Sequence, residues 1–99
     1  MPRAITEEAC KAFESGYEFK KSNTEVDGNC EGAWYMWLHG KAIAQRDRGK
    51  LYVRTAGWRT STTKERLNGL SGVSVYQKNH EWYLNNELWV NDSEWTEVS

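Results

Sequence analysis

The chain has 99 residues, with 13 basic and 14 acidic side chains. This length fits a single domain over residues 1–99, and the near-neutral balance excludes a bulk attraction to nucleic acid or to a membrane. No apolar run approaches the roughly 20 residues that span a bilayer, and the first residues lack the apolar region of a signal peptide. Six tryptophans and five tyrosines indicate an ordered, strand-forming chain.

The two cysteines, Cys10 and Cys30, show neither C-x-x-C spacing nor a disulfide framework. In a reducing compartment we expect free thiols, with Cys10 packed and Cys30 in a loop, although a disulfide between them stays open. Two cysteines and two histidines without paired spacing do not make a zinc site. We therefore predict no metal and no cofactor.

A short helix is predicted near the N-terminus. Thr6 is its expected N-cap, the glutamates that follow suit the helix dipole, and apolar residues continue at helical spacing to Phe13. Gly16 should end it. One strand over residues 17–26 should follow, before a turn at 27–29.

Hairpins are predicted in the middle of the chain. Residues 34–39 carry large side chains on both faces, which favours a central or doubly covered strand. After a further strand, Arg48-Gly49 fits a two-residue turn that would set Asp47 opposite Lys50.

A second short helix is predicted next. Thr62 and Glu65 have the spacing of a capping box, Leu67 and Leu70 supply an apolar edge, and Gly69 should help to end the helix.

The last third of the chain is predicted to be a meander. Two-residue turns are expected at 79–80 and 85–86, and the second turn would pair Tyr83 with Leu88. Residues 95–98 are expected to form a last short strand. The fold class is therefore α+β, a mainly antiparallel sheet of hairpins with two short helices as a single covering layer.

The block Thr-Thr-Lys-Glu-Arg-Leu-Asn-Gly at residues 62–69 is followed by residues 73–78 and by the hairpin strand Trp82-Tyr83-Leu84-Asn85. With Trp89, these segments resemble a group of small proteins encoded by tailed bacteriophages, over about residues 5–98. Asn86 stands where that group is expected to have glycine. The resemblance implies a viral accessory protein made inside an infected bacterium, and it implies no activity or functional residue.

Charge is segregated along the chain. Residues 39–66 carry 8 basic and 2 acidic side chains, and both flanking segments are net acidic. Cations interleaved with Tyr52 and Trp58 are what a nucleic-acid groove requires. The alternative is a solvated hairpin whose cations pair with acidic residues from the two ends of the chain. The cations are Lys41, Arg46, Arg48, Lys50, Arg54, Arg59, Lys64 and Arg66.

The approach to the second helix is a candidate anion site, because free N–H groups at a helix N-terminus favour phosphate or carboxylate. An ordinary capping box with a polar approach explains the same residues. They are Arg59, Thr60, Ser61, Thr62 and Lys64.

Two histidines, His39 and His80, fall at predicted turns. A nuclease would need a histidine, a carboxylate and an arginine placed for general acid–base chemistry, but the spacing singles out no such set. The set that could be assembled is His80 with Glu81 or Glu87 and with Arg54 or Arg59. We therefore predict no enzyme, with a nuclease as the weaker alternative.

The tryptophans divide into two groups. Trp34, Trp37, Trp82 and Trp89 are expected in the core or as cross-strand partners, whereas Trp58 and Trp95 are expected to be exposed. An exposed Trp58–Arg59 pair is typical of an interface anchor. The predicted binding residues are Trp58, Arg59, Thr60, Lys64, Arg66, Arg54, Arg46 and Arg48.

These observations predict a non-catalytic phage protein that binds a bacterial host protein in the host cytoplasm, as an inhibitor of host defence. The alternative is a protein that binds nucleic acid or an anionic nucleotide through the basic segment 41–66.

Overall fold

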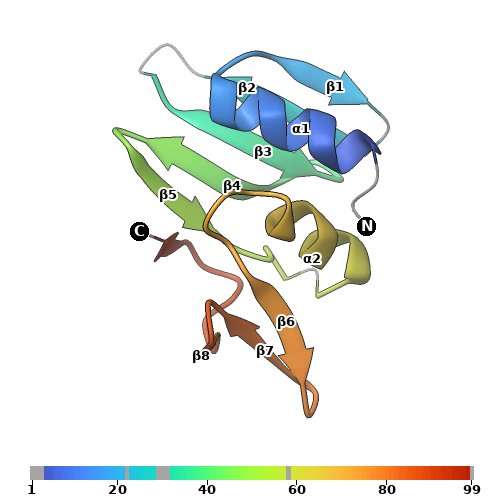
Figure 1. Ribbon diagram of the computed structural model, residues 1–99, viewed down its shortest axis with the longest axis vertical. Helices are drawn as coiled ribbons and strands as arrows, with labels where there is room; N and C mark the ends of the chain where they lie inside the picture. Colours follow the sequence, from blue (N-terminus) through green and yellow to red (C-terminus); the bar gives the residue numbers. More distant parts are fainter. Residues whose placement is uncertain (1–3, 22, 29–31, 58, 99) are drawn as a thin grey trace.

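Two antiparallel sheets and two helices make up the described part of the chain, residues 4–21, 23–28, 32–57 and 59–98 of this computed structural model (Figure 1). The larger sheet has six strands in the order β1-β2-β3-β4-β5-β9, and the smaller has three in the order β6-β7-β8. The predicted α+β class with antiparallel hairpins is confirmed. The first sheet contains β1 (Phe19–Lys21), β2 (Thr24–Gly28), β3 (Trp34–Leu38), β4 (Lys41–Asp47), β5 (Lys50–Val53) and β9 (Thr96–Val98).

The hairpin turns follow the local sequence. Both central residues have positive φ at His39-Gly40 and at Arg48-Gly49, as the tight turns between right-twisted strands require. The predicted pairing of Asp47 with Lys50 is present. The expected single strand over 17–26 is wrong, because β1 and β2 form an antiparallel pair within that region.

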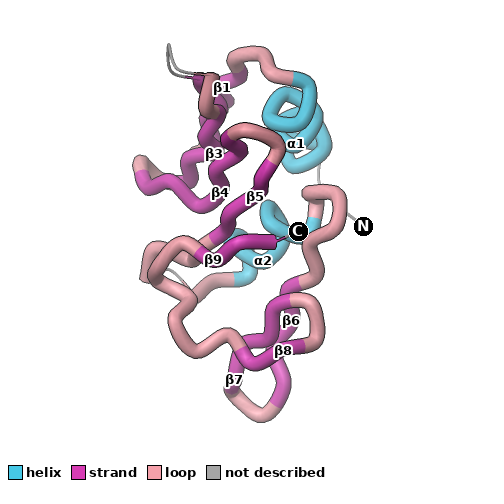
Figure 2. The backbone as a smooth tube through the Cα atoms, turned by 90° about the vertical axis from the view of Figure 1, so that its left-hand side faces the viewer, coloured by secondary structure: helices cyan, strands magenta, loops and turns pink. Residues whose placement is uncertain are grey.

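The helices α1 (Ala4–Ser15) and α2 (Ser61–Asn68) lie on one face of the six-stranded sheet, as Figures 1 and 2 show. Val26, Met36, Ala44 and Val53 are register partners across four strands, and all four are buried beneath this layer. The alternation of strand side chains places these apolar residues together, and they form part of the buried hydrophobic core.

The opposite face of this sheet has no helix over it among the residues that the structure describes (Figure 2). Tyr35, Trp37 and Tyr52 point to this face and are only partly buried. Local contacts hold two of them: the Trp37 indole donates to Asp27 at 2.9 Å, and Gln45 donates to the Tyr35 hydroxyl at 3.3 Å. Strand β3 is therefore central but covered on one side, which corrects the doubly covered alternative.

The smaller sheet lies on the side of α2 that is away from α1 (Figure 1). It contains β6 (Val75–Lys78), β7 (Glu81–Leu84) and β8 (Glu87–Leu88). Asn79-His80 and Asn85-Asn86 both have positive φ, and Tyr83 pairs with Leu88 as predicted. The predicted last strand, β9, returns to the edge of the larger sheet, where Val53 pairs with Thr96.

Both predicted helix starts are wrong by a few residues. Helix α1 begins at Ala4, so Thr6 lies inside it and is buried. Helix α2 is capped by Thr60, whose side-chain oxygen accepts from the Thr63 N–H at 3.2 Å, instead of by Thr62. Because adjacent hydroxyl residues can all serve as caps, tertiary contacts decide which one does.

One buried arginine joins the two helices to the sheet. Arg66 is 1 % exposed, and its guanidinium donates to Thr6 Oγ1 of α1 at 2.6 Å and to Thr24 Oγ1 of β2 at 2.9 Å. It also pairs with Glu65 at 2.9 Å. Three elements far apart in the sequence therefore share one hydrogen-bonded cation.

The two helices meet closely at the same junction. The Cys10 thiol donates to the Arg66 carbonyl at 3.5 Å, and a Cβ on Gly69 would lie 2.7 Å from both Cys10 Sγ and Thr6 Cγ2. Gly69 is therefore needed for the close approach of the helices. Burial raises the pKa of the Cys10 thiol to about 12. Cys10 is free and buried as predicted, whereas Cys30 lies outside the described residues.

Arg66→Ala should lower the free energy of unfolding by about 3–5 kcal/mol, because it leaves a void and removes the shared partner of buried polar groups. Arg48→Asn is the matched control: Arg48 lies in an exposed turn at φ 53°, and its replacement should change stability by less than about 0.5 kcal/mol. Urea denaturation of both variants measures the difference. Equal stabilities would contradict a structural role for Arg66.

In a Cys30→Ser variant, Cys10 should resist alkylation by iodoacetamide at pH 8, because the thiolate is the reactive form and burial disfavours it. Mass spectrometry should show modification only after denaturant is added. Rapid modification of the folded variant would mean that the junction between the helices opens readily.

Candidate functional site

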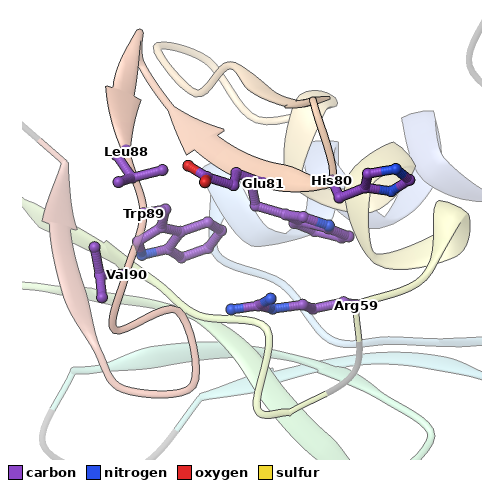
Figure 3. Close-up of a pocket in the computed structure, with 7 residues that line it drawn as sticks. Arg59, His80, Glu81, Leu88, Trp89 and Val90 are labelled. Atoms are coloured by element: carbon purple, nitrogen blue, oxygen red, sulfur yellow. The ribbon is translucent and has the colours of Figure 1, made fainter.

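A groove lies between the smaller sheet and the segment that leads into α2 (Figure 3). We call it the hairpin groove. Its volume is about 260 Å³. Figure 3 shows Arg59 facing Trp89, with Leu88 and Val90 toward one end of the groove and His80 toward the other. The residues that line it are Arg59, His80, Glu81, Trp82, Leu88, Trp89 and Val90.

Arg59 is held in place by a buried carboxylate. Its Nε donates to Asp92 Oδ2 at 2.8 Å and its Nη2 donates to Asp92 Oδ1 at 2.5 Å, a side-on bidentate pair. Asp92 also accepts from the Thr55 hydroxyl at 2.6 Å, and its carbonyl accepts from the Thr55 N–H at 2.6 Å. These bonds tie the segment after β5 to the segment before β9 and fix the arginine at the groove.

The electrostatics of this pair are asymmetric. The hydrogen bond from Arg59 lowers the pKa of Asp92; burial opposes this shift, and the Thr55 hydroxyl and the guanidinium charge reinforce it. The hydrogen bond to Asp92 in turn raises the pKa of Arg59. The Asp92 side chain is 6 % exposed and the Arg59 side chain 49 %, so the carboxylate is enclosed while the guanidinium still reaches solvent. Arg59 Nη1 makes no hydrogen bond within the described part of the chain.

The wall of the groove is rigid and aromatic. Trp89 donates its indole N–H to Thr96 at 2.9 Å and its backbone N–H to the Trp82 carbonyl at 2.9 Å. The Lys64 ammonium lies 5.4 Å from the centroid of the Trp82 ring. Both tryptophans are buried, in agreement with their predicted cross-strand role.

Exposed apolar side chains border this aromatic wall. Leu88 is 50 % exposed and Val90 69 % exposed. Tyr76 and Tyr83 stack nearby in the same sheet at 5.2 Å between ring centroids. None of these residues is among the predicted site residues, because an alternating apolar residue in a strand is normally assigned to a buried face. The one signal in the sequence was the pair of apolar residues, Leu88 and Val90, on either side of Trp89.

The predicted binding residues are not gathered on one surface. Arg59 lies in the groove, but Thr60 caps α2, and Lys64 packs on the Trp82 ring. Arg66 is buried, so its assignment to a binding surface is wrong. Trp58 lies outside the described residues.

The remaining predicted cations are dispersed over the larger sheet. Arg46 donates to the Phe13 carbonyl at 2.9 and 3.2 Å, where a cation is favoured near the C-terminus of α1. Arg54 donates to the Ala42 carbonyl at 2.7 Å and lies 4.2 Å from the centroid of the Trp95 ring. Trp95 is therefore partly buried, which corrects its predicted exposure. Segregation of charge along the sequence does not become one basic stripe in space.

The candidate nuclease set is partly brought together. Arg59, His80 and Glu81 line the same groove, but the side chains of His80 and Glu81 form no hydrogen bond or ion pair within the described residues. Arg59 is already bound to Asp92. His39 lies elsewhere, with its Nε2 3.4 Å from Asn23 Nδ2. In the described ranges, no cluster of three or more His, Cys, Asp or Glu residues could hold a metal ion.

A family model described as Kyanoviridae Gp96 protein matches residues 2–98. The chain therefore belongs to this phage family, and the predicted relationship to small phage proteins is confirmed. No curated protein and no solved structure matches the chain. Within the described residues, no helix is both long and apolar enough to cross a membrane.

Asp92→Asn should lower the free energy of unfolding by about 1–2 kcal/mol at pH 7, because charge-assisted hydrogen bonds are lost and the exposure of Arg59 limits their strength. Because the pKa of Asp92 is lower in the folded state than in the unfolded state, its carboxylate form stabilises the fold. This stabilisation is complete at pH values above the unfolded pKa of about 3.9 and is lost as the pH falls through the folded pKa.

Denaturant unfolding from pH 7 down to pH 2 tests this directly. The stability gap between the wild-type protein and Asp92→Asn should close at the acid end. A gap that stays constant with pH would show that the Asp92 charge contributes nothing.

Proposed function

We propose that this member of a phage family is a non-catalytic binding protein whose hairpin groove docks on a bacterial host protein. One observation carries the proposal: Leu88 and Val90 project into solvent beside a groove with an aromatic wall and a fixed arginine. Aromatic and arginine side chains are the residue types that dominate interface hot spots, and the exposed apolar side chains beside them add area that binding would bury.

The size of the groove favours a side chain over a small molecule. Its volume of about 260 Å³ lies below the range of about 300–1,000 Å³ that small-molecule sites occupy. An apolar side chain of the partner would enter against Trp89, and Leu88 and Val90 would be covered by the surrounding surface. Burial of this apolar area would drive association.

Arg59 would give the contact its orientation. The pairing with Asp92 neutralises much of its charge and fixes its side chain, so little side-chain entropy remains to be lost on binding. Its unused Nη1 group can donate to a carbonyl or carboxylate of the partner. The same neutralisation makes Arg59 a poor choice for a nuclease, in which a free cation would have to stabilise developing charge.

The phage family supports a partner from the infected cell. A small protein without an assembled catalytic set can act there by occupying a surface that a host protein needs, which is inhibition by steric blocking. Our proposal is that the partner is a protein of host defence and that binding takes place in the host cytoplasm.

Val90→Asp should weaken binding to the purified host partner at least tenfold, because a carboxylate in place of an apolar contact must be desolvated in the interface. The partner is first identified by pull-down from nuclease-treated host lysate, and affinities are then measured by calorimetry. The melting temperature should stay close to that of the wild-type protein, since Val90 is largely exposed.

Tyr17→Ser is the matched control, because Tyr17 is exposed and follows α1, a helix that lies away from the smaller sheet (Figure 1). It should leave affinity unchanged. Retention of full affinity by Val90→Asp, or an equal loss in both variants, would exclude the hairpin groove as the docking surface. A parallel pull-down omits the nuclease, and a partner captured only from the untreated lysate would indicate nucleic acid as the bound species.

A further inference from the structure

Another cavity, open to solvent and separate from the hairpin groove, lies beside the turn between β3 and β4. Its volume is about 380 Å³, within the range of small-molecule sites. The segment that follows β5 and the segment that precedes β9 complete its walls, and it shares no lining residue with the hairpin groove. Its lining includes Trp37, Gly40, Lys41, Arg54, Gly57 and Ser93.

The charged side chains that line this cavity are both cations. Lys41 and Arg54 contribute them, and no carboxylate is present among the described lining residues. Two members of the predicted basic segment therefore face a common space large enough for a ligand. An anion would therefore be attracted here without competing with an acidic side chain in the cavity wall.

Arg54 is already fixed in position. Its Nε donates to the Ala42 carbonyl at 2.7 Å, and its guanidinium packs on Trp95 with its central carbon 4.2 Å from the ring centroid. Neither terminal nitrogen forms a hydrogen bond within the described residues. These N–H groups match the bidentate geometry of a phosphate, and a preorganised arginine loses little freedom when it binds one.

An aromatic side chain adjoins the cations. Trp37 is partly buried, and the hydrogen bond from its indole N–H to Asp27 at 2.9 Å fixes the plane of the ring. A fixed indole beside phosphate-binding cations is the arrangement that stacks a nucleobase while its phosphate is neutralised. Neither a simple anion nor an uncharged aromatic molecule would use both features.

The rest of the wall leaves room for a ligand. A Cβ built on Gly40 or on Gly57 would meet nothing within 4 Å, so the backbone at both positions is open to close approach. Ser93 adds a hydroxyl group to the lining.

We propose that this cavity binds a nucleotide unit, with the base on Trp37 and the phosphate on Arg54 and Lys41. The nucleotide is either free or part of a single strand.

The test uses the full-length protein and four probes: adenosine 5′-monophosphate, adenosine, inorganic phosphate and a short single-stranded oligonucleotide. Calorimetry gives affinities, and the NMR signal of the Trp37 indole N–H, assigned with a Trp37→Phe variant, reports the location. Adenosine 5′-monophosphate or the oligonucleotide should shift this signal. Adenosine and phosphate alone should bind at least tenfold more weakly than the better of the two.

Lys41→Ala should weaken nucleotide binding at least threefold, and Lys50→Ala should not change it. Lys50 is the matched control because it is an exposed lysine of the same β4–β5 region outside the cavity lining. Arg54→Lys keeps the charge but loses the fork geometry of the guanidinium, so it should weaken nucleotide binding more than Lys41→Ala does. The melting temperature of each variant shows whether the fold is kept.

Three outcomes would overturn the assignment. They are no binding of either nucleotide probe, equal losses in Lys41→Ala and Lys50→Ala, and equal affinity for phosphate and for adenosine 5′-monophosphate. A preference for the oligonucleotide with the same dependence on Lys41 supports a nucleotide within a strand. A preference for the monophosphate supports a free nucleotide.

Discussion

The buried guanidinium of Arg66 is the interaction on which the arrangement of elements depends. It donates to Thr6 of α1 and Thr24 of β2 from its own place in α2. A buried cation is costly unless its hydrogen bonds are made, so this guanidinium favours the relative placement of the three elements that makes them. The helix-on-helix contact through Gly69 adds a steric constraint at the same point.

That junction positions the groove. Helix α2 is held against the larger sheet at Arg66, and its other residues support the smaller sheet, with Lys64 on the Trp82 ring and Asn68 bonded to the backbone of Val75 at 2.6 and 2.8 Å. The Arg59–Asp92 pair then closes the space from the other side. The hairpin groove thus lies between parts of the chain whose relative positions are fixed by the Arg66 contacts and by the Arg59–Asp92 pair. The wall of the groove therefore has its shape in the free protein.

The cations of the central segment show why a linear charge pattern is a weak guide to function. Arg46 binds the end of α1, Arg59 binds a carboxylate near the C-terminus, and Arg66 is enclosed in the core. Side chains alternate between the two faces along each strand, and the chain reverses direction at each hairpin turn. Cations that are close in sequence therefore lie on different faces or at different ends of the sheet. Lys41 and Arg54, in contrast, face one cavity.

Local chemistry determined much of this protein. Turn residues at Arg48-Gly49 and Asn85-Asn86 fixed the hairpins and their registers, because positive φ at both central positions is a local requirement. The sequence also indicated the phage family through its central block. Tertiary structure alone decided the helix caps, the pairing of β9 with β5, the burial of Arg66, and the exposure of Leu88 and Val90. Each of these depends on which distant segment arrives as a neighbour, and no local pattern encodes that partner.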